Sequence, residues 1–257
     1  KDAVGNAAVL TLPTAGVTGS LSANKDIVID GSLTMVRGVS AWSSQTSGTS
    51  NNLWDVYFVD ANIGWVVGDA GTILKTMDGG ANWSSQTSCT SRQFLSIYFT
   101  SADRGFAVAK SGSFCETSNG GSTWSDVTVS GMSKTSGAED LEEIFFVDSN
   151  TGWVVGNSGR ILKTTDGGTS WSSQTSGTTN MLSDVHFVNT NTGWVVGNSG
   201  IILKTIDGGS NWTSQTSGTN NGLRTVFFID SNNGWATGNY NNGTDNKILK
   251  TTDGGSN

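Results

Sequence analysis

One turn unit recurs along the chain and constrains what it can fold into. In its clearest copy, Ile161–Trp171, a short apolar stretch is followed by Asp-Gly-Gly and then by a Trp. Further copies span residues 73–83, 114–124, 202–212 and 248–257. Gly allows the positive φ of tight turns, and an Asp side chain accepts hydrogen bonds from turn amides. Each copy therefore predicts a strand, a tight turn and a Trp that opens the next strand.

The Trp after each turn sets the length of the repeat. These residues are Trp42, Trp83, Trp124, Trp171 and Trp212. They recur about every 40–50 residues. This spacing is typical of β-propeller blades, each of which contains several short strands. The sequence predicts an all-β fold, a β-propeller of four-stranded blades with five blades visible. The propeller is assigned to residues 42–257 and a separate β segment to residues 1–41.

Each unit contains four predicted strands joined by short loops. The first strand is apolar and innermost, and covers residues 53–59, 94–100, 141–147, 182–188 and 223–229. The second is the Gly-Trp-Val-Val-Gly element that begins at Gly64, Gly152 and Gly193, with variants at Gly105 and Gly234. The third is Ile-Leu-Lys-Thr, and the fourth begins at the repeating Trp.

Two hypotheses remain open for the ends of the chain. In a five-blade ring, Trp42–Ser47 would be the fourth strand of the last blade and would leave no exposed sheet edge there. If the natural chain continues, Trp42 instead ends an earlier blade and six or more blades follow. Residues 1–41 carry predicted strands at 7–12 and 25–30. They form either a decayed blade, with Arg37-Gly38 in place of Asp-Gly, or a shaft, because Leu10-Thr-Leu-Pro-Thr and Thr18-Gly-Ser-Leu21 resemble segments of phage fibre proteins.

Composition excludes some partners. The 14 basic and 21 acidic residues give a net charge of −7 without any basic run, so nucleic acid is not an expected partner. No apolar run reaches the roughly 18 residues of a membrane span. Lys1 is not a natural start, which indicates that the chain has been processed or cut.

The two cysteines occupy different kinds of position. Cys115 stands in the column held elsewhere by Leu74, Leu162, Leu203 and Leu249, which predicts a small packed side chain. Cys89 replaces the Gly of a Thr-Ser-Gly turn. A disulfide between them is the alternative, and two cysteines alone do not determine the redox compartment.

The turn unit resembles the Asp-box, Ser/Thr-x-Asp-x-Gly-x-x-Trp, as in Thr164–Trp171. Together with the Gly-Trp-Val-Val-Gly strand, it is similar to the BNR-repeat propellers related to the photosystem II assembly and stability factor. This resemblance covers residues 42–257. It implies that the Asp-box is a structural hairpin on the face away from known ligand sites.

The recurring chemistry of this hairpin gives a structural role to its acidic residue. In the weaker copy Asn119 replaces Asp, and its amide can accept the same bonds. One carboxylate per turn is too few for the six to eight oxygens that calcium takes, so no metal and no cofactor are predicted. The residues expected to act only in the turn are Asp78, Asp166, Asp207 and Asp253.

Enzymatic chemistry receives little support. Asp-boxes also occur in sialidases, but Tyr57 and Tyr98 share a packing column with the only histidine, His186, so all three are expected to be packed rings. One histidine without a partnered cysteine cannot form a Ser–His–Asp triad or a zinc site. The acidic residues at 139–143 keep a glycoside hydrolase as a minor alternative. No catalytic residue is predicted.

The predicted ligand site lies on one face of the propeller. Loops from the fourth strand to the next first strand share that face with loops between the second and third strands. Both insertions, at 131–140 and 239–246, fall there, and loops on a rigid scaffold often carry function. Trp54 is the one tryptophan outside the two packing columns, and it suits either sugar stacking or burial under a loop. The candidate ligand-binding residues are Trp54, Asp55, Arg92, Lys134, Glu139, Asp140, Glu142, Glu143, Asp184, Arg224, Tyr240, Asn242 and Asp245.

These observations predict a non-catalytic recognition or display module that binds a surface glycan or a protein. The expected setting is extracellular, on a cell surface or on a virion fibre, where the N-terminal segment would allow oligomers to form. The first alternative is an assembly factor or scaffold that binds protein chains, as the resemblance implies. Against it, the predicted loops carry no concentrated basic patch.

Overall fold

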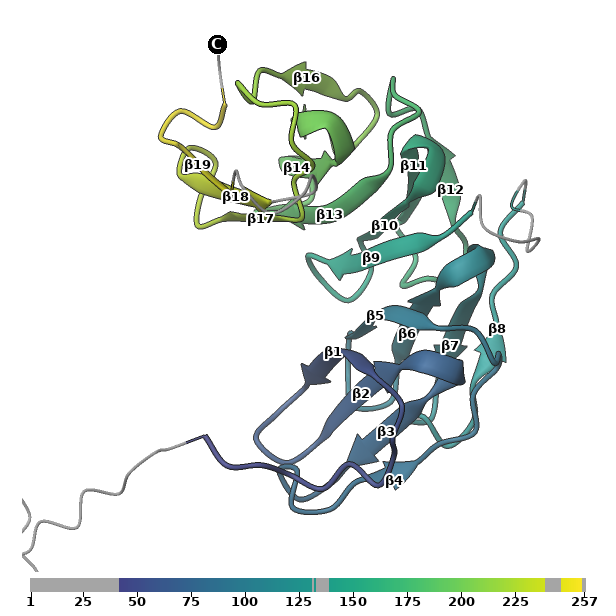
Figure 1. Cartoon of the computed structure of the whole chain (residues 1–257). Coiled ribbons are helices and arrows are strands. Elements are labelled where there is room, and N and C mark those ends of the chain that lie inside the picture. The colour runs from purple at the N-terminus through teal and green to yellow at the C-terminus, as the bar shows by residue number, and fades with distance from the viewer. Residues whose placement is uncertain (1–41, 131, 133–138, 239–245, 256–257) are drawn as a thin grey trace, which may run out of the picture. The chain divides into compact units, whose positions relative to one another are not determined.

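The computed structural model describes residues 42–130, 132, 139–238 and 246–255, which form five antiparallel sheets (Figure 1). The chain divides into Lys1–Ser44 and Gln45–Asn257, and the sheets belong to the second unit. The two strands predicted within residues 1–41 lie outside the described part. No helix in the described ranges is long and apolar enough to cross a membrane.

The first four sheets each contain four strands in sequence order, so every strand pairs with its neighbour in the chain. The first sheet contains β1 (Leu53–Phe58), β2 (Gly64–Gly68), β3 (Ile73–Thr76) and β4 (Ser84–Ser85). The second contains β5 (Phe94–Phe99), β6 (Gly105–Ala109), β7 (Phe114–Thr117) and β8 (Ser125–Asp126). The third contains β9 (Leu141–Phe146), β10 (Gly152–Gly156), β11 (Arg160–Thr164) and β12 (Ser172–Gln174). The fourth contains β13 (Leu182–Phe187), β14 (Gly193–Gly197), β15 (Ile202–Thr205) and β16 (Thr213–Gln215).

The fifth sheet has three strands among the described residues, β17 (Thr225–Phe228), β18 (Gly234–Gly238) and β19 (Lys247–Thr251). In the first four sheets a short 3-10 turn joins the second strand to the third. These turns are η1 (Asp69–Gly71), η2 (Lys110–Gly112), η3 (Asn157–Gly159) and η4 (Asn198–Gly200). The sheets are blades of a β-propeller, which confirms the predicted fold class and places each first strand within two residues of its expected bounds.

Aromatic rings fill the space between successive sheets. The indole of Trp65 on β2 stacks on Phe99 of the next sheet, with ring centroids 3.5 Å apart. The edge of Trp124, which precedes β8, meets the same Phe99 ring at 5.9 Å. Stacked and edge-on arrangements of this kind stabilise aromatic contacts beyond simple burial. Trp153 with Phe187 and Trp194 with Phe228 repeat the stack, so one interface is used several times.

Each second strand begins with Gly because the cross-strand Phe lies over it. A Cβ built on Gly64 would approach within 2.6 Å of the Phe58 ring, closer than two carbon atoms can pack. The Phe that fills the interface therefore requires Gly as its partner on the adjacent strand.

The Asp-box closes each outer hairpin through local hydrogen bonds. In the fourth sheet, the Thr205 hydroxyl donates to Asp207 at 2.9 Å and accepts the amide of Gly209 at 2.8 Å. Asp207 in turn accepts the amide of Asn211 at 2.9 Å. Asn119 accepts the corresponding amide of Thr123 at 2.9 Å. These contacts confirm the predicted structural role of the turn and its tolerance of Asn.

Replacing Thr205 by Val is expected to lower the free energy of unfolding by about 1 kcal/mol, because a buried amide of Gly209 loses its acceptor. Thr205 is 2% exposed, so water cannot replace the hydroxyl. Urea unfolding measures the change. The matched control is Thr213→Val on the exposed strand β16, which should change stability by far less; equal losses in both variants would contradict the prediction.

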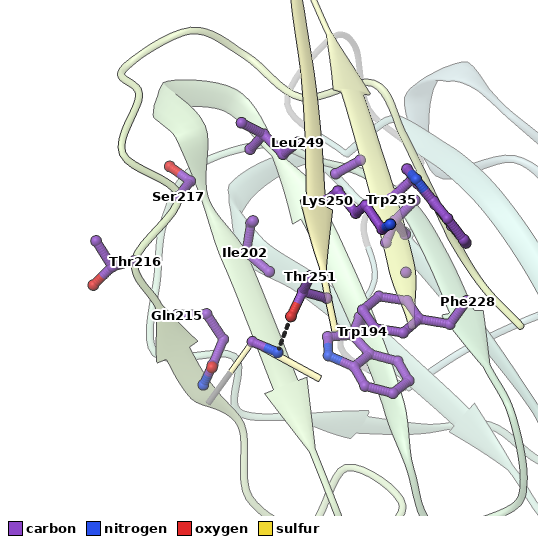
Figure 2. A pocket seen from close by; sticks show the side chains of 14 residues that line it. Trp194, Ile202, Gln215, Thr216, Ser217, Phe228, Trp235, Leu249, Lys250 and Thr251 are labelled. Carbon is purple, nitrogen blue, oxygen red and sulfur yellow. Dashed lines mark hydrogen bonds between the residues drawn. The ribbon is translucent and has the colours of Figure 1, made fainter. Parts of the chain in front are cut away.

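A cavity of about 170 Å³ lies between the fourth and fifth sheets (Figure 2). It is lined by Trp194 and Phe228, by Leu249 and Thr251 of β19, and by Gly255 of the last turn. The predicted closing strand at Trp42–Ser47 is not observed, because these residues form no strand and the fifth sheet ends at β19 within the described residues.

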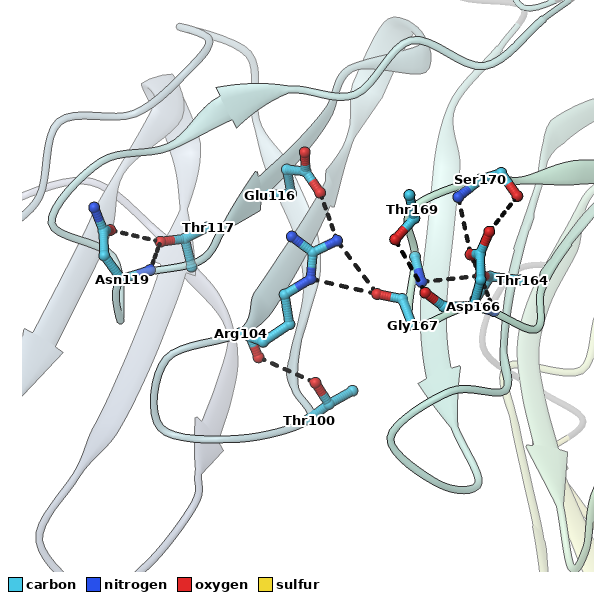
Figure 3. Close-up of polar contacts among 11 residues, drawn as sticks. Thr100, Arg104, Glu116, Thr117, Asn119, Thr164, Asp166, Gly167, Thr169 and Ser170 are labelled. Atoms are coloured by element: carbon cyan, nitrogen blue, oxygen red, sulfur yellow. Dashed lines mark hydrogen bonds and ion pairs between the residues drawn. The ribbon is translucent and has the colours of Figure 1, made fainter.

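Arg104 compensates for an altered interface between the second and third sheets (Figure 3). Elsewhere a second-strand Trp donates its indole N–H to the turn of the next sheet, as Trp65 does to the Gly120 carbonyl at 3.2 Å. Phe106 has no such donor, and the Arg104 guanidinium donates instead to the Gly167 carbonyl, at 3.2 and 3.3 Å.

The Arg104 guanidinium also takes the place of a lysine ammonium. In the four other sheets a third-strand Lys ammonium lies over the second-strand indole, as Lys163 does over Trp153 at 5.5 Å. The second sheet carries Glu116 at that position. Arg104 lies 4.6 Å over the Phe106 ring and pairs with Glu116 at 2.8 Å. One residue thus restores both the donor and the positive charge.

Cys89 and Cys115 form a disulfide with a Cα–Cα distance of 6.0 Å. The prediction that Cys115 packs as an unpaired side chain is wrong in that respect, although the residue is buried with the core of the first interface. The bond arises because the turn that holds Cys89 crosses to the second sheet and lies against β7. It ties a loop of the candidate face to the scaffold.

Candidate functional site

The 3-10 turns and the loops that lead into each first strand pack together on one face. The amide of Asp69 in η1 donates to the Asn52 carbonyl at 2.9 Å, and that of Lys110 in η2 donates to the Gln93 carbonyl at 3.0 Å. Equivalent bonds hold η3 and η4. The middle residue of each turn has a left-handed backbone, with φ between 53° and 59°. We call this surface the loop face.

Trp54 presents an aromatic surface on the loop face. Its side chain is 54% exposed, yet its indole N–H donates to Asp69 at 2.7 Å. The Asn52 amide donates to the other carboxylate oxygen of Asp69 at 2.8 Å. Residues of β1, η1 and the preceding loop therefore hold the indole in one orientation while its ring stays open to solvent.

Charged groups of both signs lie on the neighbouring turns. Arg92 donates to the Ser111 hydroxyl at 2.8 Å, and the Ser111 amide donates to Asp140 at 2.7 Å. Arg160, the first residue of β11, forms an ion pair with Glu139. Loops that belong to the second and third sheets are thus joined by predicted site residues.

Glu142 lies among charges from three sheets. Burial raises the pKa of its carboxyl, and the charge of Asp140 raises it further. The positive charges of Arg224 and Lys110 lower the pKa and partly offset this effect. Arg224 precedes β17 and Lys110 begins η2, so this point of the loop face collects side chains from widely separated parts of the chain.

Asp55, Glu143 and Asp184 bind the strand scaffold instead of facing the loops. Asp55 accepts the amide of Ile97 at 2.8 Å, and Asp184 accepts that of Val226 at 2.7 Å. Each bond joins one first strand to the next. One carboxylate oxygen of each therefore has a structural role between sheets, and contact of these side chains with a ligand stays a prediction.

Glu143 belongs to the same series. Its carboxylate oxygen accepts the Ser96 hydroxyl at 2.7 Å. Burial raises the pKa of Glu143 well above its usual range, and the nearby Asp184 charge raises it further. Burial also raises the pKa of Asp184 to about 7, although two backbone amides counter the shift. The carboxyls of the inner strands therefore hold protons more strongly than exposed ones.

His186 is a packed ring, as its sequence column predicts. It lies between Phe145 and Phe227, with ring centroids 5.2 and 4.9 Å away. Burial lowers its pKa, which favours the neutral imidazole. In the described ranges no group of three or more His, Cys, Asp or Glu side chains is placed to hold a metal ion.

Four predicted site residues, Lys134, Tyr240, Asn242 and Asp245, lie outside the described residues. Conversely, the structure adds Asp69, Lys110, Ser111 and Arg160 to the loop face, all in or beside the 3-10 turns. The sequence did carry a signal for Asp69 and Lys110. The residue directly after each second strand is Asp, Lys, Asn and Asn in turn, and it varies while the strand repeats.

Solved structures that are similar to this chain have low sequence identity to it. A GH74 enzyme from Niastella koreensis is 19% identical with a TM-score of 0.64, over 79% of this chain and 37% of that one. The WD40 propeller domain of Doa1 is 14% identical with a TM-score of 0.59, over 74% and 62%. These two share the propeller fold with this chain. YCF48 bound to a D1 peptide is 17% identical with a TM-score of 0.45, over 80% and 93%.

The sequence itself carries a family relationship. A search among curated protein sequences gave no significant match. The family model described as photosynthesis system II assembly factor YCF48 matches residues 35–93, 86–175, 135–218 and 173–257. Together these matches run through all five sheets without a break. The chain belongs to the family of the photosynthesis system II assembly factor YCF48.

Proposed function

We propose that this chain is a protein-binding assembly or scaffold module that binds a polypeptide segment on its loop face. The single observation that carries the proposal is Trp54, whose ring is exposed but whose N–H is anchored by Asp69. Exposed aromatic side chains with little freedom to lose are typical energetic centres of protein interfaces. Membership of an assembly-factor family supports the same interpretation.

The charges on the loop face support a polypeptide partner. Arg92, Glu139, Asp140 and Glu142 bring both signs to the loop face within the second and third sheets. A peptide backbone with mixed side chains can pair with such a surface, and charge complementarity would determine the register of binding. A phosphate backbone or an anionic membrane would instead require a basic surface.

Trp54→Ala is expected to weaken binding of a selected peptide at least tenfold, since truncating a central aromatic residue of an interface commonly has an effect of that size. Peptides are selected from a random display library with the intact chain as bait, and titration calorimetry measures the dissociation constants. The matched control is Met77→Ala, which changes an exposed apolar side chain on the Asp-box turn. Unchanged affinity in Trp54→Ala, or equal losses in both variants, would exclude the site.

A surface glycan is the second candidate ligand, and Trp54 is again the reason. A solvent-facing indole flanked by the carboxylate of Asp69 and the amide of Asn52 has the composition of a sugar-stacking site. A glycan array run beside the peptide selection separates the two. Binding to sugars alone, abolished in Trp54→Ala, would replace the peptide proposal.

A non-catalytic role is part of the proposal. Asp55, Glu143 and Asp184 use their carboxylate oxygens in bonds between strands, which supports a structural assignment for the acidic residues of the inner strands. A panel of chromogenic glycosides tests the alternative. Hydrolysis that disappears on Glu142→Gln or Glu143→Gln substitution would overturn the non-catalytic assignment.

We also propose an extracellular or surface setting. The Cys89–Cys115 disulfide supports it, because such bonds persist mainly in oxidising compartments. A virion fibre is one such setting, suggested by the sequence of residues 10–21, which lie outside the described part of the chain.

A further inference from the structure

The first strands of the first four sheets share a β-bulge, and the side chain at the bulge differs from sheet to sheet. In the fourth sheet, β13 pairs with β14 on both sides of Ser183 but not at Ser183 itself, which is the extra residue. Bulges re-aim a side chain and are common beside functional sites. The repeated strand therefore presents a variable group at this one position. The equivalent residues in the first three sheets are Trp54, Leu95 and Glu142.

The bulge residue of the fourth sheet leaves two polar atoms without partners. In the first sheet the Trp54 indole spans from the bulge to Asp69, the first residue of η1, and bonds it at 2.7 Å. The equivalent pair in the fourth sheet is Ser183 and Asn198, the first residue of η4. A Ser hydroxyl is much shorter than an indole. Ser183 Oγ and Asn198 Oδ1 are both buried, and neither has a hydrogen-bond partner in the described structure.

The environment of Ser183 makes this absence costly. The residue is only 8% exposed, and a buried polar group without a partner loses the hydrogen bonds that water gave it. By equivalence with the first sheet, Ser183 and Asn198 lie on the same side of their sheet and are separated by a distance that an indole can bridge. A hydrogen-bonding group placed between them would satisfy both atoms.

Glu142 supplies an unpaired carboxylate from the neighbouring sheet. It is the bulge residue of β9, which packs against β13. Its half-buried carboxyl makes no hydrogen bond and no ion pair within the described ranges. The charges of Lys110 and Arg224 act on it only from a distance, and Asp140 adds a second negative charge. Burial raises the pKa of Glu142, which means that its negative charge lacks adequate compensation.

The three groups together match one chemical class of ligand. Ser183 Oγ, Asn198 Oδ1 and the Glu142 carboxylate can all accept hydrogen bonds, and one of them carries a negative charge. A primary ammonium has three donors, a positive charge and no acceptor. An anion would meet the Glu142 charge and leave the acceptors unsatisfied. The two nearby cations, Lys110 and Arg224, are exposed, so water screens their repulsion of an incoming ammonium.

We propose that Ser183, Asn198 and Glu142 bind the side-chain ammonium of a lysine in the polypeptide held by the loop face. The source of this lysine rests on the proposed function, whereas the preference for an ammonium rests on the three acceptors. A lysine is chosen over a chain N-terminus because its four-carbon stem can reach buried acceptors while the peptide backbone stays at the surface. An N-terminal amine would have to bring its backbone into the site.

A double-mutant cycle between chain and ligand tests the contact. Peptides selected on the intact chain are synthesised with acetylated N-termini, and those that depend on Trp54 are expected to share a lysine. Norleucine at that position keeps most of the stem without the ammonium and should weaken binding about tenfold or more by titration calorimetry. In Glu142→Gln the same peptide change should have an effect of less than about threefold.

The control for this cycle is Asp103→Asn, which removes an exposed carboxylate outside the loop face. It should leave the norleucine effect at its full size. A norleucine effect that is equally large in Glu142→Gln would overturn the lysine contact. Trp54-dependent peptides without a shared lysine, or binding that is lost when their N-termini are acetylated, would also overturn it. These outcomes leave the peptide-binding proposal standing.

Ser183→Ala separates binding from a structural role. The substitution removes a buried hydroxyl that has no partner, so it strands no other group. The free energy of unfolding measured in urea should not fall, while affinity for the lysine peptide should decrease about threefold or more. Unchanged affinity in this variant would contradict the assignment of Ser183.

A small probe tests the ammonium site without any peptide. Nα-acetyl-lysine methylamide is titrated into the isotope-labelled chain to about 50 mM, which covers the millimolar dissociation constants expected of a single small group. The amide resonances of Ser183 and Asn198 should shift, and the norleucine analogue should not shift them. Equal effects of the two probes, or none, would overturn the site. Shifts with lysine alone, in a chain for which no Trp54-dependent peptide is found, would support the site and reject the proposed function.

Discussion

The free energy of unfolding is expected to fall by about 3 kcal/mol as the pH rises from 4 to 7. Asp184, with its pKa near 7 against an ordinary 3.8, binds a proton in the folded state that the unfolded chain has released. Stability from such a group is complete below the unfolded pKa and is lost as pH rises through the folded one. The shift corresponds to about 4 kcal/mol at most, and solvent at the partly exposed carboxyl reduces it.

The Asp-box carboxylates have the opposite effect at lower pH, where the free energy of unfolding rises with pH because of them. Hydrogen bonds from Ser170 and Asn211 lower the pKa of Asp166 and Asp207 to about 2. Their contribution is present above the unfolded value of 3.8 and is lost as the pH falls toward 2. Stability should therefore be greatest near pH 4, and urea unfolding between pH 2.5 and pH 8 measures the profile.

Glu143→Gln tests whether the buried carboxyls of the inner strands cause this loss of stability between pH 4 and pH 7. Gln has the shape of a protonated Glu and keeps the oxygen that accepts the Ser96 hydroxyl. The slope between pH 4 and pH 7 should become shallower, because Glu143, whose pKa burial raises well above its usual range, no longer titrates. The control is Asp103→Asn on an exposed loop. A profile that rises toward pH 7, or is equally steep in Glu143→Gln, would contradict the assignment.

Arg104→Ala should lower the free energy of unfolding by about 2 kcal/mol. The Gly167 carbonyl loses its donor, which costs about 1 kcal/mol or more at a partly buried site. The cation over Phe106 contributes about a further 0.5–1 kcal/mol. The exposed part of the pair with Glu116 adds little. Urea unfolding at constant pH measures the change.

Phe106→Trp in the Arg104→Ala background gives the decisive comparison. The introduced indole N–H should donate to the Gly167 carbonyl, as Trp65 does to the corresponding carbonyl in the first interface. About half of the lost stability is expected to return. Arg92→Ala serves as the control for removal of an arginine, because Arg92 lies on the loop face and contacts Ser111. No recovery in the double variant would show that Arg104 acts in some other way.

The sequence predicted the sheets well because their determinants are local. The turn chemistry of Thr164–Trp171 and the Gly-Trp-Val-Val-Gly strand lie within a few residues of their own contacts. The shared face of the two loop types followed from the same strand order. The disulfide and the role of Arg104 could not be predicted in this way, because Cys89 and Cys115 are 26 residues apart and Arg104 contacts a carbonyl 63 residues away.

The candidate site was predicted less completely for the same physical reason. Whether a carboxylate on a first strand reaches solvent or an amide of the next sheet depends on the distance between sheets. Asp184 and Glu142 are both acidic residues near the start of a first strand, yet Asp184 binds Val226 and Glu142 lies among the loop charges. The spacing of the repeats does not show whether a given first-strand carboxylate contacts the next sheet or the loop charges.

The self-contained hydrogen bonding of the Asp-box bears on how the chain acquires its structure. Thr205, Asp207, Gly209 and Asn211 make their contacts within a single turn. Asp184 and Val226, in contrast, are separated by 42 residues. Because local contacts have a small loop-closure cost, the outer hairpins can form soon after their residues leave the ribosome. The inner strands must wait until the following repeat has been synthesised, so each blade is completed one unit behind the growing end.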